Sequence, residues 1–134
     1  MRRRVLADTN IFVSAFVFPG SVPDQAFQHI LSFDRLVVTN WVLGEFDRIV
    51  ETKWPQRLAA ARLFIAALEY DLVEPSAITL QISDPNDQPV LEGAVSGRAD
   101  IIVTGDKRFF ALGLARPQVL TARQYLELQP YFAS

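Results

Sequence analysis

Ile101-Ile102-Val103-Thr104-Gly105-Asp106 is the stretch that decides the fold of this chain. Its first four residues are a continuous apolar and β-branched run, which is typical of a strand buried on both faces of a sheet. A second run, Arg4-Val5-Leu6-Ala7, is followed by Asp8-Thr9-Asn10. Each of these predicted strands therefore ends close to an aspartate.

Segments with helical spacing separate the strand-like runs. The predicted helices cover residues 23–33, the stretch after Thr39 as N-cap, the stretch beginning near Pro55, the stretch beginning at Asp87, and residues 122–128. Further short strands are predicted at 36–38, 72–73 and 119–120, whereas residues 78–83 are ambiguous. We expect the apolar stretch 5–18 to form a buried strand and a turn. Strands that alternate with helices predict an α/β fold, a three-layer α/β/α sandwich with a mainly parallel central sheet.

Composition indicates one compact domain covering residues 1–134, because 50% of the 134 residues are hydrophobic and 21% are charged. The absence of cysteine excludes disulfides, zinc–thiolate sites and thiol catalysis, and is compatible with a cytoplasmic location. No apolar run approaches the roughly 18 residues of a membrane helix, so we expect a soluble protein. The net charge of −2 gives no global attraction to nucleic acid, so such binding would need a local basic surface or a metal bridge.

Four acidic residues fall at the ends of predicted strands or in the helices that follow: Asp8, Glu45, Asp87 and Asp106. In a parallel α/β sheet these positions meet at the carboxyl edge, where ligands bind. Carboxylates held close together repel one another unless a cation or a proton intervenes. Oxygen ligands without cysteine or convergent histidines favour a hard ion, Mg²⁺ or Mn²⁺.

These motifs, taken together and in order, resemble the PIN domain family. They are Asp8-Thr9-Asn10 after the first strand, Glu45 in a helix, Asp84-Pro-Asn-Asp87 before a helix, and Gly105-Asp106-Lys107 after a buried strand. The similarity extends from about Val5 to about Leu126. Within the family, the chain resembles the PIN-type toxins of bacterial and archaeal toxin–antitoxin pairs. It implies a Mg²⁺-dependent ribonuclease, usually a homodimer, that acts on RNA and is inhibited by a cognate antitoxin.

The resemblance also implies roles for individual residues. Asp8, Glu45, Asp87 and Asp106 match the catalytic acidic quartet, with Asp8, Asp87 and Asp106 as metal ligands. Asn10, Thr104 and Asp84 would support them, Asp84 as a turn former or an outer hydrogen-bonding partner, and Lys107 and Arg108 could contact substrate phosphate. Glu45 would be a ligand or would orient the attacking water. The implied chemistry is attack on a phosphodiester by a metal-activated water.

Other interpretations use the same residues. An aspartate after a strand is often only a helix cap or a turn former. A PIN-like module could bind metal, protein or RNA without catalysing a reaction. A haloacid-dehalogenase-like phosphatase also begins with an aspartate after its first strand, but it needs a second aspartate two positions later, where this chain has Asn10.

Overall fold

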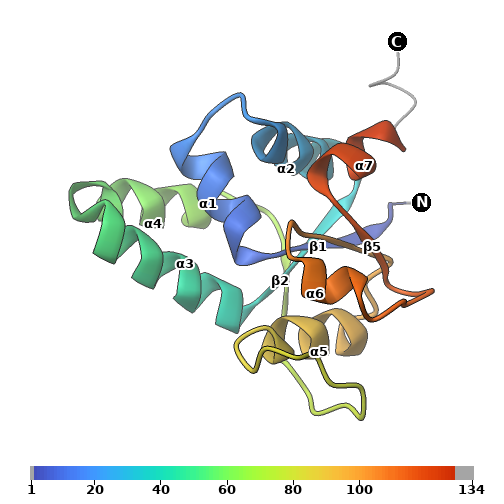
Figure 1. Ribbon diagram of the computed structural model, residues 1–134. Helices are drawn as coiled ribbons and strands as arrows, with labels where there is room; N and C mark the ends of the chain where they lie inside the picture. Colours follow the sequence, from blue (N-terminus) through green and yellow to red (C-terminus); the bar gives the residue numbers. More distant parts are fainter. Residues whose placement is uncertain (1, 129–134) are drawn as a thin grey trace.

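The central sheet has five parallel strands in the order β3-β2-β1-β4-β5. The computed structural model describes residues 2–128 (Figure 1). The strands are β1 (Arg4–Ala7), β2 (Arg35–Thr39), β3 (Asp71–Val73), β4 (Ile101–Val103) and β5 (Gln118–Leu120). Strand β1 lies in the middle, and its Leu6 is paired with Val37 of β2 and Ile102 of β4. The side chains of all three are fully buried, which explains the continuous apolar runs in the sequence.

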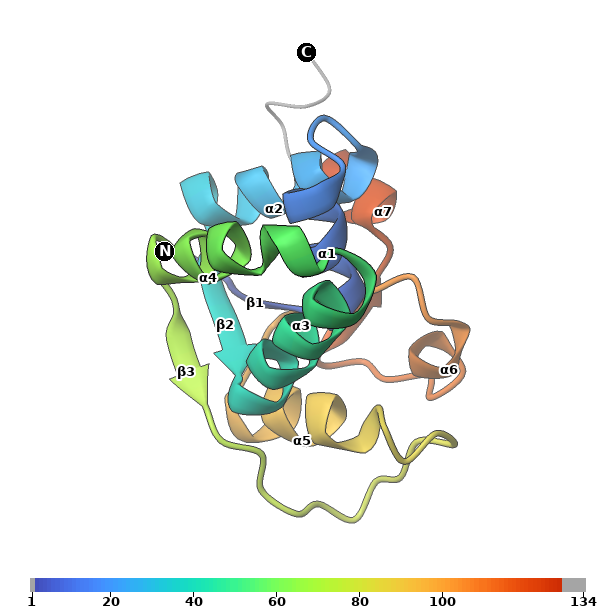
Figure 2. The same cartoon turned by 90° about the vertical axis from the view of Figure 1, so that its left-hand side faces the viewer.

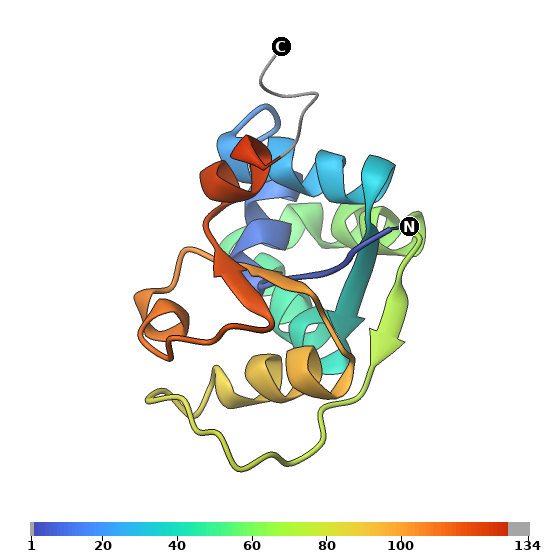
Figure 3. The same cartoon turned by 90° about the vertical axis from the view of Figure 1, so that its right-hand side faces the viewer.

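Helices cover both faces of this sheet. They are α1 (Thr9–Val17), α2 (Val22–Phe33), α3 (Asn40–Lys53), α4 (Leu58–Ala66), α5 (Gln88–Ser96), α6 (Lys107–Phe110) and α7 (Ala122–Glu127), with a 3-10 turn at Pro55–Arg57. Figures 1 and 3 show α1, α2 and α7 on one side of the sheet and α5 on the other. The predicted fold class, a three-layer α/β/α sandwich with a parallel sheet, is confirmed. Within residues 2–128, no helix is long and apolar enough to span a membrane.

One local prediction was wrong, because the stretch after Asp8 is the helix α1 rather than part of a strand and a turn. The Asp8 side chain accepts a hydrogen bond from the Ile11 backbone N–H and so caps this helix. Ile11 and Phe12 are buried on one side of α1, while several of its other residues are apolar as well. A helix that is apolar around most of its circumference has little amphipathic period, so the pattern did not reveal it.

Helix α5 lies very close to β2. A Cβ atom added at Gly93 would be 2.2 Å from the Thr39 Cγ2 atom, so only glycine allows this approach. Residues 78–83 belong to the irregular loop between β3 and α5. Figures 2 and 3 show that this loop ends beside α6, at the same end of the molecule. The start of α5 and the start of α6 are thus brought together.

Candidate functional site

Asp8 lies between β1 and α1 and is buried, with 7% of its surface exposed. Its Oδ1 accepts a hydrogen bond from the Ile11 N–H at 3.3 Å, and its Oδ2 accepts one from the Thr104 hydroxyl. Burial raises the pKa of Asp8 from its ordinary 3.8 to about 6, although these hydrogen bonds oppose the rise. A cation close to Asp8 would therefore stabilise its ionised form.

Thr104 connects the carboxyl ends of two neighbouring strands. Its side chain is fully buried after β4, and its hydroxyl donates to Asp8. The same oxygen accepts a hydrogen bond from the Asp106 backbone N–H at 3.0 Å. Thr104 thus links Asp8 to the Asp106 backbone, and its role in supporting a catalytic site stays a prediction.

Three aspartates gather around the guanidinium of Arg108. Asp84 Oδ2 lies 2.6 Å from its Nη1, Asp106 Oδ2 lies 2.9 Å from its Nη2, and Asp87 Oδ2 lies 3.5 Å from its Nε. Asp84 also accepts a hydrogen bond from the Asn86 N–H at 2.9 Å, which is the turn-forming contact predicted for it. The Arg108 guanidinium thus binds two carboxylates of the 84–87 loop and the carboxylate of Asp106 just before α6.

Asp87 has the N-cap position of α5, as predicted, but its side chain makes no capping hydrogen bond. Instead its carboxyl group lies within hydrogen-bonding reach of Asp106. Burial, with this hydrogen bond and the charge of Asp106, raises the pKa of Asp87 to about 6. The hydrogen bond from Arg108 lowers the pKa of Asp106. The two neighbouring carboxyl groups are therefore strongly unequal as acids.

Glu45 projects from α3 toward the start of α1, where the Thr9 hydroxyl donates a hydrogen bond to its Oε1. Thr9 is buried and follows Asp8 directly, so this contact brings Glu45 to the Asp8 side of the site. The sequence analysis did not select Thr9, although a hydroxyl residue beside the first aspartate was an available signal. The Asn10 backbone contributes a hydrogen bond to Asp8, whereas the Asn10 residue as a whole and Lys107 are exposed.

The donor chemistry of the site fits a hard divalent cation. The four predicted acidic residues supply only carboxylate oxygens, and the Oδ2 atom of Asp87 is buried without a hydrogen-bond donor among the described residues. The present side-chain positions are not those of a formed metal site, since among residues 2–128 no group of three or more His, Cys, Asp and Glu side chains could hold an ion. Arg108 forms ion pairs with two of the four acidic residues, Asp87 and Asp106, and with Asp84.

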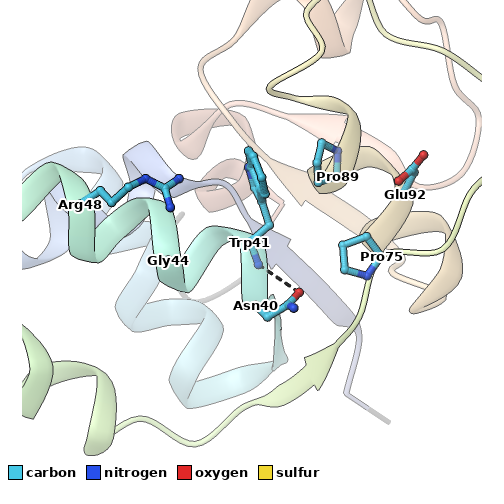
Figure 4. Close-up of a pocket in the computed structure, with 7 residues that line it drawn as sticks. All are labelled: Asn40, Trp41, Gly44, Arg48, Pro75, Pro89 and Glu92. Carbon is cyan, nitrogen blue, oxygen red and sulfur yellow. Dashed lines mark hydrogen bonds between the residues drawn. The ribbon is translucent and has the colours of Figure 1, made fainter.

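A pocket of about 420 Å³ lies between the first turns of α3 and α5 (Figure 4). Its lining comes from the start of α3, the chain after β3 and the first turns of α5: Asn40, Trp41, Gly44, Arg48, Pro75, Pro89 and Glu92. The Arg48 guanidinium carbon lies 5.7 Å from the centre of the Trp41 ring. None of the four predicted acidic residues lines this pocket, but Gly44 precedes Glu45 directly and Pro89 lies two residues after Asp87.

The fold has a solved counterpart in the crystal structure of VapBC2 from Rickettsia felis bound to a DNA fragment from their promoter. The two chains superpose with a TM-score of 0.65 and 16% sequence identity, covering 87% of this chain and 96% of the other. A comparison with curated proteins gave no match. A sequence profile described as the PIN domain matches residues 4–108, a range that includes Asp8, Glu45, Asp87 and Asp106. The chain therefore belongs to the PIN domain family.

Proposed function

We propose that this protein is a metal-dependent endoribonuclease that hydrolyses RNA phosphodiester bonds at Asp8, Glu45, Asp87 and Asp106. PIN domains are generally nucleases, which supports a hydrolytic role. The observation that carries the proposal is the contact of Asp87 with Asp106, together with the link that Thr104 makes between Asp8 after β1 and the Asp106 backbone after β4. Asp8 and Asp87 both have raised pKa values there, and the buried Asp87 Oδ2 has an ion-pair contact with Arg108 but no hydrogen-bond donor among residues 2–128.

Asp8, Asp87 and Asp106 would hold Mg²⁺, with Mn²⁺ as a substitute. When bound, the ion would supply a water of lowered pKa and would stabilise charge on the phosphate. Thr104 fixes the rotamer of Asp8, and Thr9 fixes that of Glu45, so both carboxylates are oriented before substrate arrives. Glu45 would bind the metal ion or orient the attacking water from the α3 side.

The direct test is cleavage of a panel of structured RNAs by purified protein in Mg²⁺, Mn²⁺ or EDTA. Glu45→Gln and Glu51→Gln form a matched pair, since both residues lie on α3 and Glu51 is exposed. We expect cation-dependent cleavage that is lost in Asp8→Asn, reduced at least about tenfold in Glu45→Gln and unchanged in Glu51→Gln. Undiminished cleavage by an Asp8→Asn, Asp87→Asn double variant would refute the proposed site.

We further propose that the protein is the toxin of a toxin–antitoxin pair and forms a homodimer. The motif resemblance to PIN-type toxins and the fold similarity to VapBC2 support the pairing. A cavity of about 510 Å³ between α3 and α4 offers an apolar surface, lined partly by Leu43, Phe46 and Ile65. Leu63, on the same helix as Ile65, is 72% exposed. A helix of a small antitoxin would bury such a surface. Pull-downs of the tagged protein that never recover a small partner protein would count against the pairing.

One observation favours a second candidate, a PIN module that binds partners without catalysis. Arg108 already forms ion pairs with Asp84, Asp87 and Asp106, so one positive charge of the protein offsets part of their negative charge without a metal. Calorimetry with Mn²⁺ beside the cleavage assay separates the two candidates. Metal binding without any cleavage of the RNA panel would favour the binding module, whereas both together would favour the nuclease.

A further inference from the structure

The Arg108 side chain makes more ionic contacts with the acidic cluster than any other basic group among the described residues. Its Nε and backbone N–H both donate to Asp106 Oδ1, at 3.0 and 2.9 Å, and its Nη2 donates to Asp106 Oδ2 at 2.9 Å. Its Nη1 donates to Asp84 Oδ2 at 2.6 Å. Both oxygens of Asp106 are therefore taken by one guanidinium.

A divalent cation at this site would need some of the same oxygen atoms. Asp106 has no oxygen left that is not bound to Arg108, and Asp87 Oδ2 lies 3.5 Å from the Arg108 Nε. A metal ion held by Asp8, Asp87 and Asp106 would share two of these carboxylates, Asp87 and Asp106, with the guanidinium, and the two cations would repel each other. The two cations therefore compete for these oxygens. With Arg108 in place, no three or more His, Cys, Asp and Glu side chains among residues 2–128 are arranged to hold a metal ion.

We propose that Arg108 is a built-in competitor of the metal ion, and that a divalent cation binds only when the guanidinium leaves Asp84, Asp87 and Asp106. This inference rests on the proposed metal-dependent function. Arg108 is the second residue of α6 and its side chain is 47% exposed, so rotation of the side chain alone can release it into solvent. The released guanidinium stays beside the cluster, where it can bind an RNA phosphate. Metal and phosphate binding are then coupled through one side chain.

The test is calorimetric titration of metal-free protein with Mn²⁺ alone, without RNA. Arg108→Gln and Lys107→Gln each remove one positive charge from adjacent positions of α6, but Asp84, Asp87 and Asp106 form their ion pairs with Arg108 and not with Lys107. Competition predicts that Arg108→Gln binds Mn²⁺ at least about fivefold more tightly than wild type, a modest value because the ion pairs are half exposed. Lys107→Gln measures the effect of net charge alone and is expected to change the affinity less than about twofold.

A second readout uses thermal unfolding followed by circular dichroism. In EDTA, Arg108→Gln leaves three neighbouring carboxylates without their cation and is expected to melt below wild type, whereas saturating Mn²⁺ should raise its melting temperature more than that of wild type. Equal or weaker Mn²⁺ affinity in Arg108→Gln, or equal tightening in both variants, would overturn the competition. Absence of Mn²⁺ binding in every protein, including Arg108→Gln, would instead remove the metal site and the proposed function with it.

Discussion

Replacement of Asp8 by asparagine is expected to stabilise the metal-free protein at neutral pH, although it should destroy the proposed activity. Asp8 is 7% exposed, and burial raises its pKa from 3.8 to about 6. Each pKa unit corresponds to about 1.4 kcal/mol, so ionised Asp8 costs the metal-free fold at most about 3 kcal/mol at pH 7.5. Asparagine keeps an oxygen for the Ile11 N–H and offers an amide to Thr104. We therefore expect a gain of about 1–3 kcal/mol in the free energy of unfolding.

The pH dependence of the free energy of unfolding follows from the same raised pKa of Asp8. Between pH 4 and 6 the folded wild-type protein binds more protons at Asp8 than the unfolded chain, so its stability from this group rises as the pH falls. The advantage of Asp8→Asn should then be full above pH 6 and should vanish near pH 4. Taking the difference between the two proteins removes the titration of carboxylates that they share.

Urea unfolding in EDTA at pH 7.5, 6, 5 and 4 measures this difference. Saturating Mn²⁺ supplies a second condition, in which wild type gains stability by binding the ion and Asp8→Asn gains less. An Asp8→Asn variant that is less stable than wild type at pH 7.5 in EDTA would refute the reasoning. A stability difference that stays constant from pH 7.5 to pH 4 would refute it as well.

Two further predictions concern the scaffold and are measured by urea unfolding. Gly93→Ala should destabilise the protein by about 1–3 kcal/mol because its Cβ would lie 2.2 Å from Thr39, whereas Gly44→Ala, with its nearest atom at 3.5 Å, should stabilise α3 by about 0.5–1 kcal/mol. Equal effects would contradict the close packing of α5. The pKa of Asp71 is lowered to about 2 by hydrogen bonds from Arg35 and Arg4. Asp71→Asn should lose roughly 1 kcal/mol at pH 7, discounted for 36% exposure, and this loss should disappear as the pH falls from 4 to 2.

The sequence predicted most of the scaffold because its elements carry local signals. The buried runs at Arg4–Ala7 and Ile101–Val103 are β1 and β4, and the helix predicted for residues 23–33 is α2, Val22–Phe33. Thr39 caps α3 through a 3.1 Å hydrogen bond from the Val42 N–H. Such elements depend on neighbours within a few residues, so their spacing and capping chemistry can be read directly.

The remaining features depend on contacts between distant parts of the chain. The position of Arg108 requires the 84–87 loop and the start of α6 to meet, and no local pattern encodes this encounter. The hydrogen bond from Thr9 to Glu45 joins α1 to α3 across 36 residues. Helix α6 is a single turn, Lys107–Phe110, which is too short to show a period. The sequence therefore indicated the acidic residues, but not that Arg108 forms ion pairs with three of the aspartates.

Helix capping alone does not account for the acidic residues. Asp8 and Asp106 do cap α1 and α6, so a structural role is sufficient to explain where they stand. Asp87 has the corresponding position on α5 but makes no side-chain capping bond, which forgoes about 1 kcal/mol of helix stability. Its carboxyl group faces Asp106 instead, and its pKa rises to about 6. Both features destabilise the metal-free fold, and the ion pair with the Arg108 Nε at 3.5 Å offsets only part of this cost, since the pKa of Asp87 stays raised. A set of ordinary helix caps does not predict this placement of Asp87, whereas the proposed metal site does.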